Sequence, residues 1–359
     1  MLSKIGPSTD QLEITLIGPG YGECVVIHCE GEWIVIDSCR DARNKRPGAC
    51  EYLTSINVDA SAVKLVACTH WHDDHIGGLS EVFQTYKNAA FCLSGALKSA
   101  EFAKVAEIFR DWHLKQQLPI SSGMDELTDI LTSIRESGRR PSFAIANRQI
   151  WQSPSGASRL VALSPSDETT MQANAQFATL VPGLWTDQRR ARDASPNHIA
   201  VAMHLVCGVH TVLLGSDLEE HGNPHTGWSA VVADSARPQS KASLYKVAHH
   251  GSETAEHPRI WADLLKDKPI TVMSPFSKAL NPLPTAEQRA VIKTRSARSF
   301  VSADLEARSI KRRGPLGRIV GQRNLRLAQP NLGWVRARTL AADPTAVWEV
   351  EYAGDAVEL

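Results

Sequence analysis

The residues with the clearest capacity for chemistry lie in one run, Cys68-Thr69-His70-Trp71-His72-Asp73-Asp74-His75-Ile76-Gly77-Gly78. The apolar residues 63–68 before it are predicted to form a strand, so three imidazoles and two carboxylates gather where the chain turns. Residues two apart in an extended segment point the same way, so His70 and His72 can bind one ion while Asp74 and His75 reach a second. A histidine-rich surface turn is the weaker alternative, because clustered histidines repel one another once protonated. The run therefore predicts a metal site.

The pattern His-x-His-x-Asp-His after a strand resembles the signature of the metallo-β-lactamase superfamily. Further segments match the order of motifs in that family, namely Ile34-Val35-Ile36-Asp37-Ser38, Leu213-Leu214-Gly215-Ser216-Asp217 with a serine inserted, and Lys246-Val247-Ala248-His249-His250-Gly251-Ser252. The resemblance extends from about Gly18 to Pro284. It implies an α/β fold, a four-layer αββα sandwich with the metal ions at one edge between two sheets.

The same resemblance implies a set of roles around two divalent cations. The implied metal ligands are His70, His72, Asp74, His75, Asp217 and one of His249 and His250. Asp37 would steady a ligand histidine through its second ring nitrogen. Strand periodicity does not decide between His249 and His250, so both remain candidates, and the histidine that is not a ligand would face the substrate.

Many superfamily members carry a further ligand histidine about twenty residues before the bridging aspartate. Asn197 and His198 occupy this region. His198 therefore remains a candidate metal ligand, with an ordinary imidazole on a strand as the alternative, and Asn197 is predicted to support the site.

Several details resemble the soluble hydrolase domain of ComEC-type competence proteins. These details are the opening Gly18-Pro19-Gly20-Tyr21-Gly22-Glu23-Cys24, the strand Val161-Ala162-Leu163-Ser164-Pro165, the segment from Asn197 to Ala200, and His249-His250-Gly251-Ser252. The chain departs from that pattern at Glu23, at Ala200 and at Leu283-Pro284. The resemblance implies phosphodiester chemistry but not DNA uptake, because the chain contains no membrane channel.

These observations favour a metal-dependent hydrolase, most strongly a phosphodiesterase or nuclease that acts through a metal-bound hydroxide on a nucleic acid or a nucleotide-like substrate. Asp74, His249, His250 and Ser252 are the predicted catalytic residues, and Ser252 could also bind phosphate. Zinc suits the histidine-rich ligand set, although manganese or iron would also fit. Two alternatives remain: a hydrolase of a thioester, lactone or β-lactam with the same metal site, and a non-catalytic binding module.

Charge is distributed unevenly along a chain whose formal net charge is zero. Residues 289–338 contain many arginines and lysines but only Asp304 and Glu306 as acids, and Arg312 and Arg313 are candidate phosphate-binding residues. A solvated basic face is the alternative. Only Phe300 and Trp334 are aromatic in this stretch, so base stacking is poorly supported.

Periodicity and turn residues predict how the chain is organised. Residues 1–300 are predicted to form the hydrolase domain, with a helical insertion at about 98–140, and residues 301–359 a basic C-terminal extension with a small β-rich appendage. The seven scattered cysteines favour buried free thiols. The apolar N-terminal stretch is short and is broken by Gly18, so we expect a cytoplasmic protein without membrane association.

Overall fold

The computed structural model describes the chain except for residues 1, 19–21, 115–121, 185–195, 278–281 and 305–331. Its centre is a pair of eight-stranded sheets. The first sheet has the order β15 (Glu349–Ala353), β14 (Gly333–Leu340), β1 (Gln11–Gly18), β2 (Cys24–Cys29), β3 (Glu32–Ile36), β4 (Val63–Cys68), β5 (Ala90–Ser94) and β6 (Ser142–Ala144). Neighbours are antiparallel from β15 to β3 and parallel from β3 to β6.

The second sheet is also mixed. Its order is β16 (Val357–Glu358), β13 (Arg298–Val301), β12 (Leu265–Met273), β11 (Ala242–Lys246), β10 (His210–Leu214), β9 (Met203–Cys207), β8 (Arg159–Ala162) and β7 (Gln149–Gln152). The four strands from β13 to β10 are parallel. Ligands in mixed and parallel sheets bind beyond the carboxyl ends of parallel strands, so these strands and β3 to β6 mark where a site can form.

Alternation along the strands explains why the two sheets stack. In β2 and β3, the side chains of Val25, Ile27, Ile34 and Ile36 face the core between the sheets, whereas Cys24, Val26, Trp33 and Val35 face a second core under the helices. Both faces of these strands are buried, which accounts for their nearly continuous apolar sequence. A third core lies between the second sheet and its helices.

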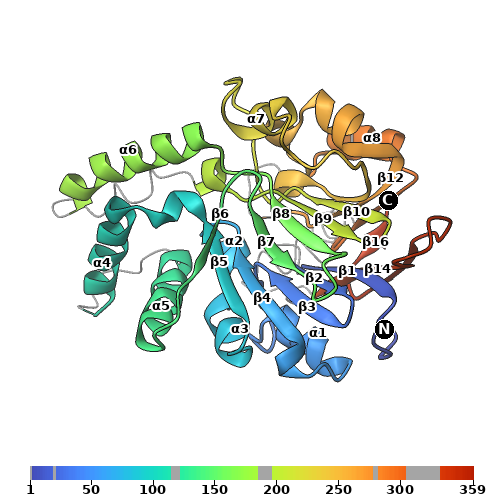
Figure 1. Ribbon diagram of the computed structural model, residues 1–359, viewed down its shortest axis with the longest axis horizontal. Coiled ribbons are helices and arrows are strands. Elements are labelled where there is room, and N and C mark those ends of the chain that lie inside the picture. Colours follow the sequence, from blue (N-terminus) through green and yellow to red (C-terminus); the bar gives the residue numbers. More distant parts are fainter. Residues whose placement is uncertain (1, 19–21, 115–121, 185–195, 278–281, 305–331) are drawn as a thin grey trace, which may run out of the picture.

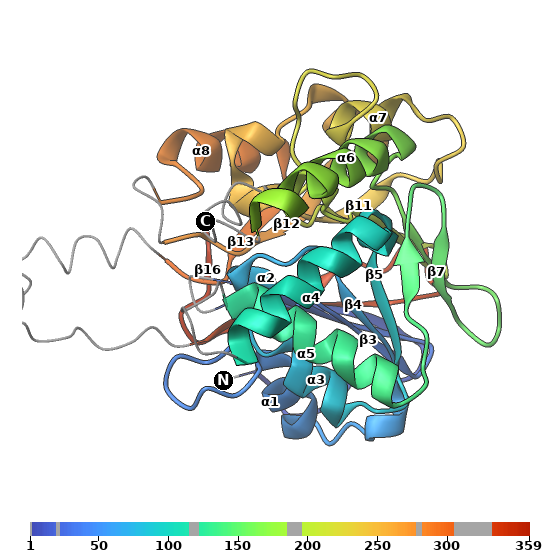
Figure 2. The same ribbon diagram turned by 90° about the vertical axis from the view of Figure 1, so that its left-hand side faces the viewer.

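Helices complete the outer layers. They are α1 (Gly48–Ser55), α2 (Asp73–Ile76), α3 (Leu79–Thr85), α4 (Ala100–Leu114), α5 (Ser122–Glu136), α6 (Asp167–Leu184), α7 (Gly227–Ala233) and α8 (Ala286–Arg295). Figures 1 and 2 show α1 and α3 below the sheets and α7 and α8 above them. The expected αββα sandwich is therefore confirmed. Among the described residues, none of the helices is both long and apolar enough to cross a lipid bilayer.

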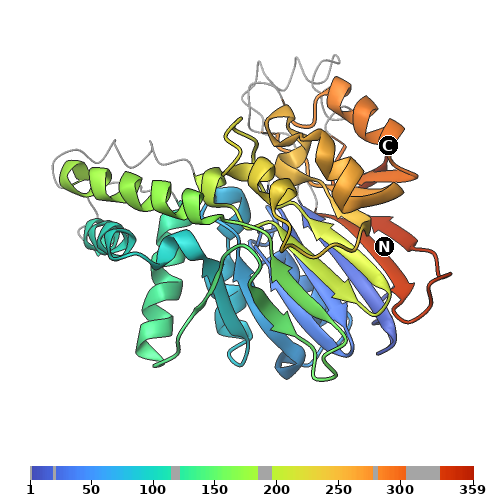
Figure 3. The same cartoon turned by 45° about the horizontal axis from the view of Figure 1, so that its top comes forward.

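The helical insertion lies at one side of the sandwich. Helices α4 and α5 fall inside the predicted range of 98–140, and α6, which the sequence analysis did not identify, packs against α4. Figure 3 shows these helices projecting beyond the ends of the sheets. The aromatic ring of Trp71 joins them to the metal-binding run, since its centroid lies 5.7 Å from that of Phe102 in α4 and 5.9 Å from that of Phe177 in α6.

The described C-terminal residues correct one prediction. Instead of forming a separate appendage, strand β14 pairs with β1 along its whole length, from Gly18↔Gly333 to Gln11↔Leu340. Strand β16 then pairs with β13 at the edge of the second sheet. The C-terminal strands therefore complete both sheets. The sequence pattern did not reveal this because the pairing joins residues more than three hundred positions apart.

The cysteines correct a second prediction. Cys29, at the end of β2, and Cys207, at the end of β9, form a disulfide with a Cα–Cα distance of 6.4 Å. They belong to different sheets and are separated by 178 positions, so only the stacking of the sheets brings them together. The five remaining cysteines are free and buried, as expected.

Candidate metal centre

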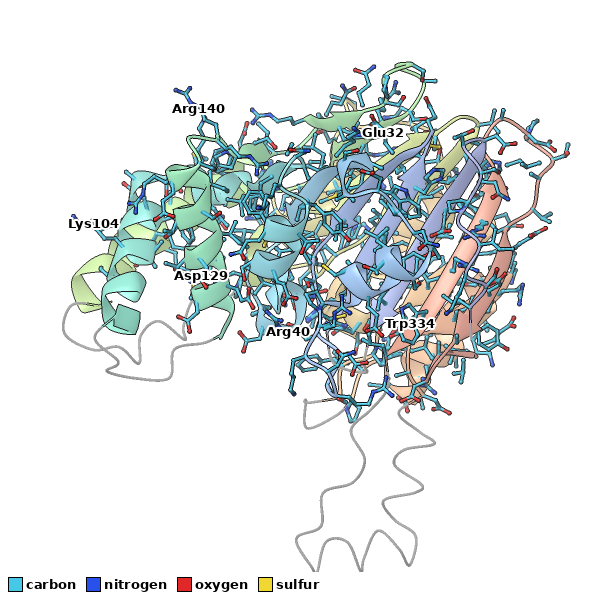
Figure 4. The ribbon with its side chains drawn as sticks, turned by 90° about the horizontal axis from the view of Figure 1, so that it is seen from below. Glu32, Arg40, Lys104, Asp129, Arg140 and Trp334 are labelled. Atoms are coloured by element: carbon cyan, nitrogen blue, oxygen red, sulfur yellow. A yellow bond between two sulfur atoms is a disulfide. The ribbon has the colours of Figure 1, made fainter. Side chains whose placement is uncertain are left out.

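The predicted site residues gather at one edge of the sandwich, beyond the carboxyl ends of parallel strands in both sheets. Asp37 follows β3, His70 follows β4, Asp217 follows β10 and His250 follows β11. Figure 4 shows Glu32, at the start of β3, at one end of the first sheet, with Arg40 and Trp334 toward the other end. The site lies at the end of the sheet where β3 and β4 finish, so residues distant in the sequence meet there.

Asp37 organises the metal-binding run. Its carboxylate accepts hydrogen bonds from the backbone N–H of Thr69 at 2.7 Å and from the Thr69 hydroxyl at 2.6 Å. The Nδ1 atom of His75 lies 2.8 Å from Asp37 Oδ2. A carboxylate at Nδ1 directs the opposite ring nitrogen, Nε2, toward a metal position. Asp37 therefore contacts the Nδ1 side of a candidate ligand histidine.

Two groups of side chains share Asp217. In the first, the ligand atoms of His70, His72 and Asp217 all lie within 4.8 Å of one another, and in the second the same holds for Asp74, His75, Asp217 and His250. Imidazoles and carboxylates are the donors that zinc binds in proteins. A carboxylate common to both groups can bridge two cations.

Burial and orphaned atoms indicate that the second group fits a divalent cation. His75 Nε2 and Asp217 Oδ1 are buried 3.1 Å apart, yet neither atom makes a hydrogen bond within the described part of the chain. Buried polar atoms without partners are costly, so such atoms point to a missing ligand. The two histidines and two aspartates of the second group supply the donors that a divalent cation would need.

The electrostatics differ between the histidines of the two groups. Burial, together with the neighbouring His75 and His72, holds the pKa of His70 well below its ordinary value, and burial also lowers the pKa of His72. Both rings are therefore neutral near pH 7 and can offer a lone pair. Burial lowers the pKa of His250, but the carboxylates of Asp217 and Asp74 outweigh it and raise the pKa to about 10.

The two histidines of the pair have different positions. Both lie in left-handed backbone, with φ of 44° at His249 and 56° at His250, and their ring centroids lie 6.0 Å apart. His250 is buried, with Nε2 3.0 Å from Asp74 Oδ2 and Nδ1 3.0 Å from the carbonyl oxygen of Ser274. His249 belongs to neither group that shares Asp217. The geometry favours His250 as the ligand of the pair.

His249 is instead held by polar neighbours beside the site. Its Nδ1 lies 3.0 Å from Glu219 Oε1 and 3.0 Å from the hydroxyl of Thr254, while its Nε2 lies 3.2 Å from Nδ2 of Asn197. Asn197 is buried and its Oδ1 has no hydrogen-bond partner among the described residues. The ring of His249 is therefore fixed at both nitrogens next to the ligand groups.

The remaining candidates are not members of the ligand groups or lie outside the described residues. His198 stacks on His221 with ring centroids 4.1 Å apart, and it belongs to none of the ligand groups formed by the described residues. The hydroxyl of Ser252 accepts a hydrogen bond from the backbone N–H of Thr254 at 3.3 Å. Arg312 and Arg313 fall in residues 305–331, outside the described part of the chain.

In the described part of the basic stretch, residues 289–304 and 332–338, the arginines are paired with acids and are not free to bind phosphate. Its described arginines form ion pairs, which are Arg289–Asp304, Arg295–Glu256, Arg298–Glu358, Arg336–Glu351 and Arg338–Glu13. All of these acids except Asp304 come from segments outside the stretch. The one-sided charge of the sequence is therefore compensated in space for these residues.

Sequence analysis did not identify two charged residues beside the ligands. Glu23 and Lys246 are 2% and 1% exposed, and they form an ion pair with each other. Glu23 Oε1 lies 3.7 Å from His75 Nδ1, and Lys246 Nζ lies 4.0 Å from Asp217 Oδ1. Lysine is almost never fully buried unless it is paired with an acid. The position of Lys246 at the end of an apolar strand, close to His249 and His250, could therefore have indicated a buried ion pair at the site.

Comparison with known proteins agrees with the arrangement of the site. Residues 17–120 match a family model described as the metallo-beta-lactamase superfamily. This segment contains Asp37 and the run from His70 to His75. No curated protein matches the chain significantly.

Several solved structures are similar to this chain in part. The metallo-beta-lactamase fold protein YhfI from Bacillus subtilis is 13% identical, with 81% of this chain and 95% of that chain covered and a TM-score of 0.39. MEM-A1, a subclass B3 metallo-beta-lactamase from a soil metagenome library, is 14% identical over 66% and 78% of the two chains, with a TM-score of 0.36. A Cronobacter sakazakii metallo-beta-lactamase with a HARLDQ motif is 14% identical over 65% and 73%, with a TM-score of 0.34. Similarity at this level does not identify a substrate.

Proposed function

We propose that this chain is a metal-dependent phosphodiesterase, because residues 17–120 match the model of the metallo-β-lactamase superfamily, whose members are generally metal-dependent hydrolases. The observation that carries the proposal is the pair of ligand groups that share Asp217. Sites with two neighbouring cations recur in phosphatases and nucleases, where both the attacking and the leaving oxygen of a displacement need stabilisation.

The residues present define which side chains would hold the cations. His70, His72 and Asp217 would bind one ion, and Asp74, His75, Asp217 and His250 the other. Two bound cations, with zinc or manganese as the proposed metals, would lower the pKa of water and offset the negative charge of a phosphodiester. Asp37 would keep His75 oriented through Nδ1.

His249 is the residue proposed to move a proton. With Nδ1 held by Glu219 and Thr254, the ring presents Nε2 to Asn197 at the side of the ligand groups. A protonated His249 ring could pass a proton from Nε2 to the leaving oxygen, and the Asn197 amide, which donates to the unprotonated Nε2 in the structure, could instead donate a hydrogen bond to a phosphate oxygen. The resemblance of the His249-His250-Gly251-Ser252 element to ComEC-type domains supports the choice of phosphodiesters.

The test is hydrolysis of bis-p-nitrophenyl phosphate by the full chain reconstituted with zinc or manganese. His72→Ala should abolish turnover, whereas the matched variant His225→Ala, at an exposed histidine outside the ligand groups, should keep it. Metal-dependent turnover that responds in this way supports the proposal. Metal binding without phosphodiester turnover contradicts it.

A second candidate, hydrolysis of a thioester, lactone or β-lactam with the same ligands, is favoured by one observation. The described arginines of the basic stretch are ion-paired, so they add little net charge for recognising phosphates. A thioester substrate and nitrocefin, assayed in parallel with the same variants, distinguish the two candidates. Turnover of either one without phosphodiester turnover would favour the second candidate.

A further inference from the structure

The strongest feature outside the ligand set is the buried ion pair between Glu23 and Lys246. It joins the two sheets, because Glu23 comes just before β2 and Lys246 ends β11. The backbone N–H of Glu23 donates to the carbonyl oxygen of Asp74 at 2.8 Å, so the pair also contacts the metal-binding run. Glu23 Oε2 is buried and makes no hydrogen bond to a described residue. A buried ion pair is weak evidence for stability, which leaves its purpose to be explained.

Lys246 also contacts the residue that precedes the shared carboxylate. Its Nζ donates to the carbonyl oxygen of Ser216 at 3.1 Å, and the backbone N–H of His249 donates to the same oxygen at 2.8 Å. Ser216 lies in left-handed backbone, with φ of 46°. A serine is strained in this conformation, which glycine adopts freely. The Ser216 hydroxyl is buried without a hydrogen-bond partner among the described residues, so it does not compensate for the strain.

The turn at Ser216 determines where Asp217 points. Gly215 has no room for a side chain, because a Cβ there would lie 2.8 Å from Ala248, so the backbone passes close to Ala248 just before the bend at Ser216. We propose that Lys246, fixed by Glu23, is a positioning residue that holds Ser216 in its left-handed turn and so aims the Asp217 carboxylate at both cations. This inference rests on the proposed metal site but not on the identity of the substrate.

The test measures zinc affinity by competition with a chromophoric chelator, so it does not depend on turnover. The double variant Glu23→Gln/Lys246→Met removes both charges of the pair together, which leaves no uncompensated buried charge and no change in net charge. We expect its zinc affinity to fall about 10–100-fold, the usual effect of removing support from a metal ligand. Lys241→Met, at an exposed lysine just before the same strand, is the matched control and should bind zinc as the wild type does.

A third substitution separates positioning from general structural support. Adding Ser216→Gly to the double variant makes the left-handed turn favourable without Lys246, so most of the lost zinc affinity should return. Circular dichroism and thermal unfolding establish that each variant is folded. Unchanged zinc affinity in the double variant would overturn the proposal, and so would a loss that Ser216→Gly fails to restore.

The outcomes remain separate from those for the proposed function. A wild-type chain that binds two zinc ions but hydrolyses no phosphodiester would contradict the function while leaving the role of Lys246 intact. A wild-type chain that binds fewer than two ions would contradict the shared role of Asp217 and this inference with it.

Discussion

At the scale of single residues, two adjacent histidines have different positions and are expected to have different roles. His250 is buried among the carboxylates of Asp74 and Asp217, whereas His249 is held by Glu219 and Asn197 outside the ligand groups. His250→Ala should therefore lose about one equivalent of bound zinc. His249→Ala should retain both ions but lose about 10²-fold in kcat, the lower range for removing a general acid. Metal analysis combined with steady-state kinetics checks both results, and loss of an ion from His249→Ala would reverse the assignment.

A second residue-scale prediction concerns pH and stability. His28 is neutral in the fold, because its Nδ1 donates to the carbonyl oxygen of Gln11 at 2.8 Å and its Nε2 accepts from Gly31 at 3.1 Å. Burial lowers its pKa, so the unfolded chain binds a proton more readily than the folded one. This contribution to stability is complete above the unfolded pKa of about 6.5 and is lost as the pH falls through that value toward the folded pKa.

The measurement is the thermal midpoint between about pH 7.5 and about pH 5.5, a range in which histidine titrates. His28→Gln should show a smaller decrease in midpoint than the wild type, since glutamine does not titrate. The exposed His225→Gln serves as control and should follow the wild type. Equal pH dependence in all three chains would show that His28 does not contribute.

Much of the site could be predicted at this scale, because the pattern from His70 to His75 is local and its residue types match metal chemistry. The choice between His249 and His250 could not be predicted, since it depends on left-handed backbone at both residues. Glu23 and Lys246 were missed as a pair for a related reason. Their ion pair forms only when strands from two sheets meet, and nothing in the local sequence of either residue indicates the other.

At the scale of elements, the insertion is attached to the metal-binding run. Asp73 Oδ1 accepts a hydrogen bond from the backbone N–H of Gly123 in the first turn of α5 at 2.7 Å, and so acts as a cap for that helix. Gly123 is required there, because a Cβ would lie 2.2 Å from the carbonyl oxygen of Trp71. The close approach of α5 to Trp71 and Asp73 couples the insertion to the site.

Asp73→Ala should reduce the free energy of unfolding by about 1 kcal/mol, the typical cost of losing a helix cap. Asp73→Asn keeps an oxygen acceptor and should be nearly neutral. Both variants should bind as much zinc as the wild type, because Asp73 belongs to neither ligand group that shares Asp217. Urea denaturation and metal analysis test these expectations, and loss of an ion from Asp73→Ala would assign this carboxylate to the metal site instead.

The elements themselves were predicted unevenly. Strand β4 and helices α4 and α5 carry local patterns of the right period, and they lie where expected. Helix α6 was not predicted, because it lies between β8 and β9, whose apolar strand patterns were the clearest features of that part of the sequence. The place of β14 could not be predicted, because its pairing with β1 is a long-range contact that leaves no mark on the sequence around residues 333–340.

At the scale of the whole molecule, the disulfide between Cys29 and Cys207 joins the two sheets directly. The double variant Cys29→Ala/Cys207→Ala should lose about 2–5 kcal/mol of stability, as is typical of a cross-link that closes a long loop. Cys92→Ala, at a buried free cysteine, is the control for the loss of a buried thiol. Thiol titration of the unfolded, unreduced chain should find five of the seven cysteines free, and seven free thiols would show that the bond does not form.

Zinc stoichiometry is the measurement that shows whether two cations share Asp217. The wild-type chain should bind two equivalents of zinc, and Asp217→Asn at most one, because the carboxylate belongs to both ligand groups. The exposed Asp267→Asn is the matched control and should bind two. Two tightly bound equivalents in folded Asp217→Asn would contradict the account.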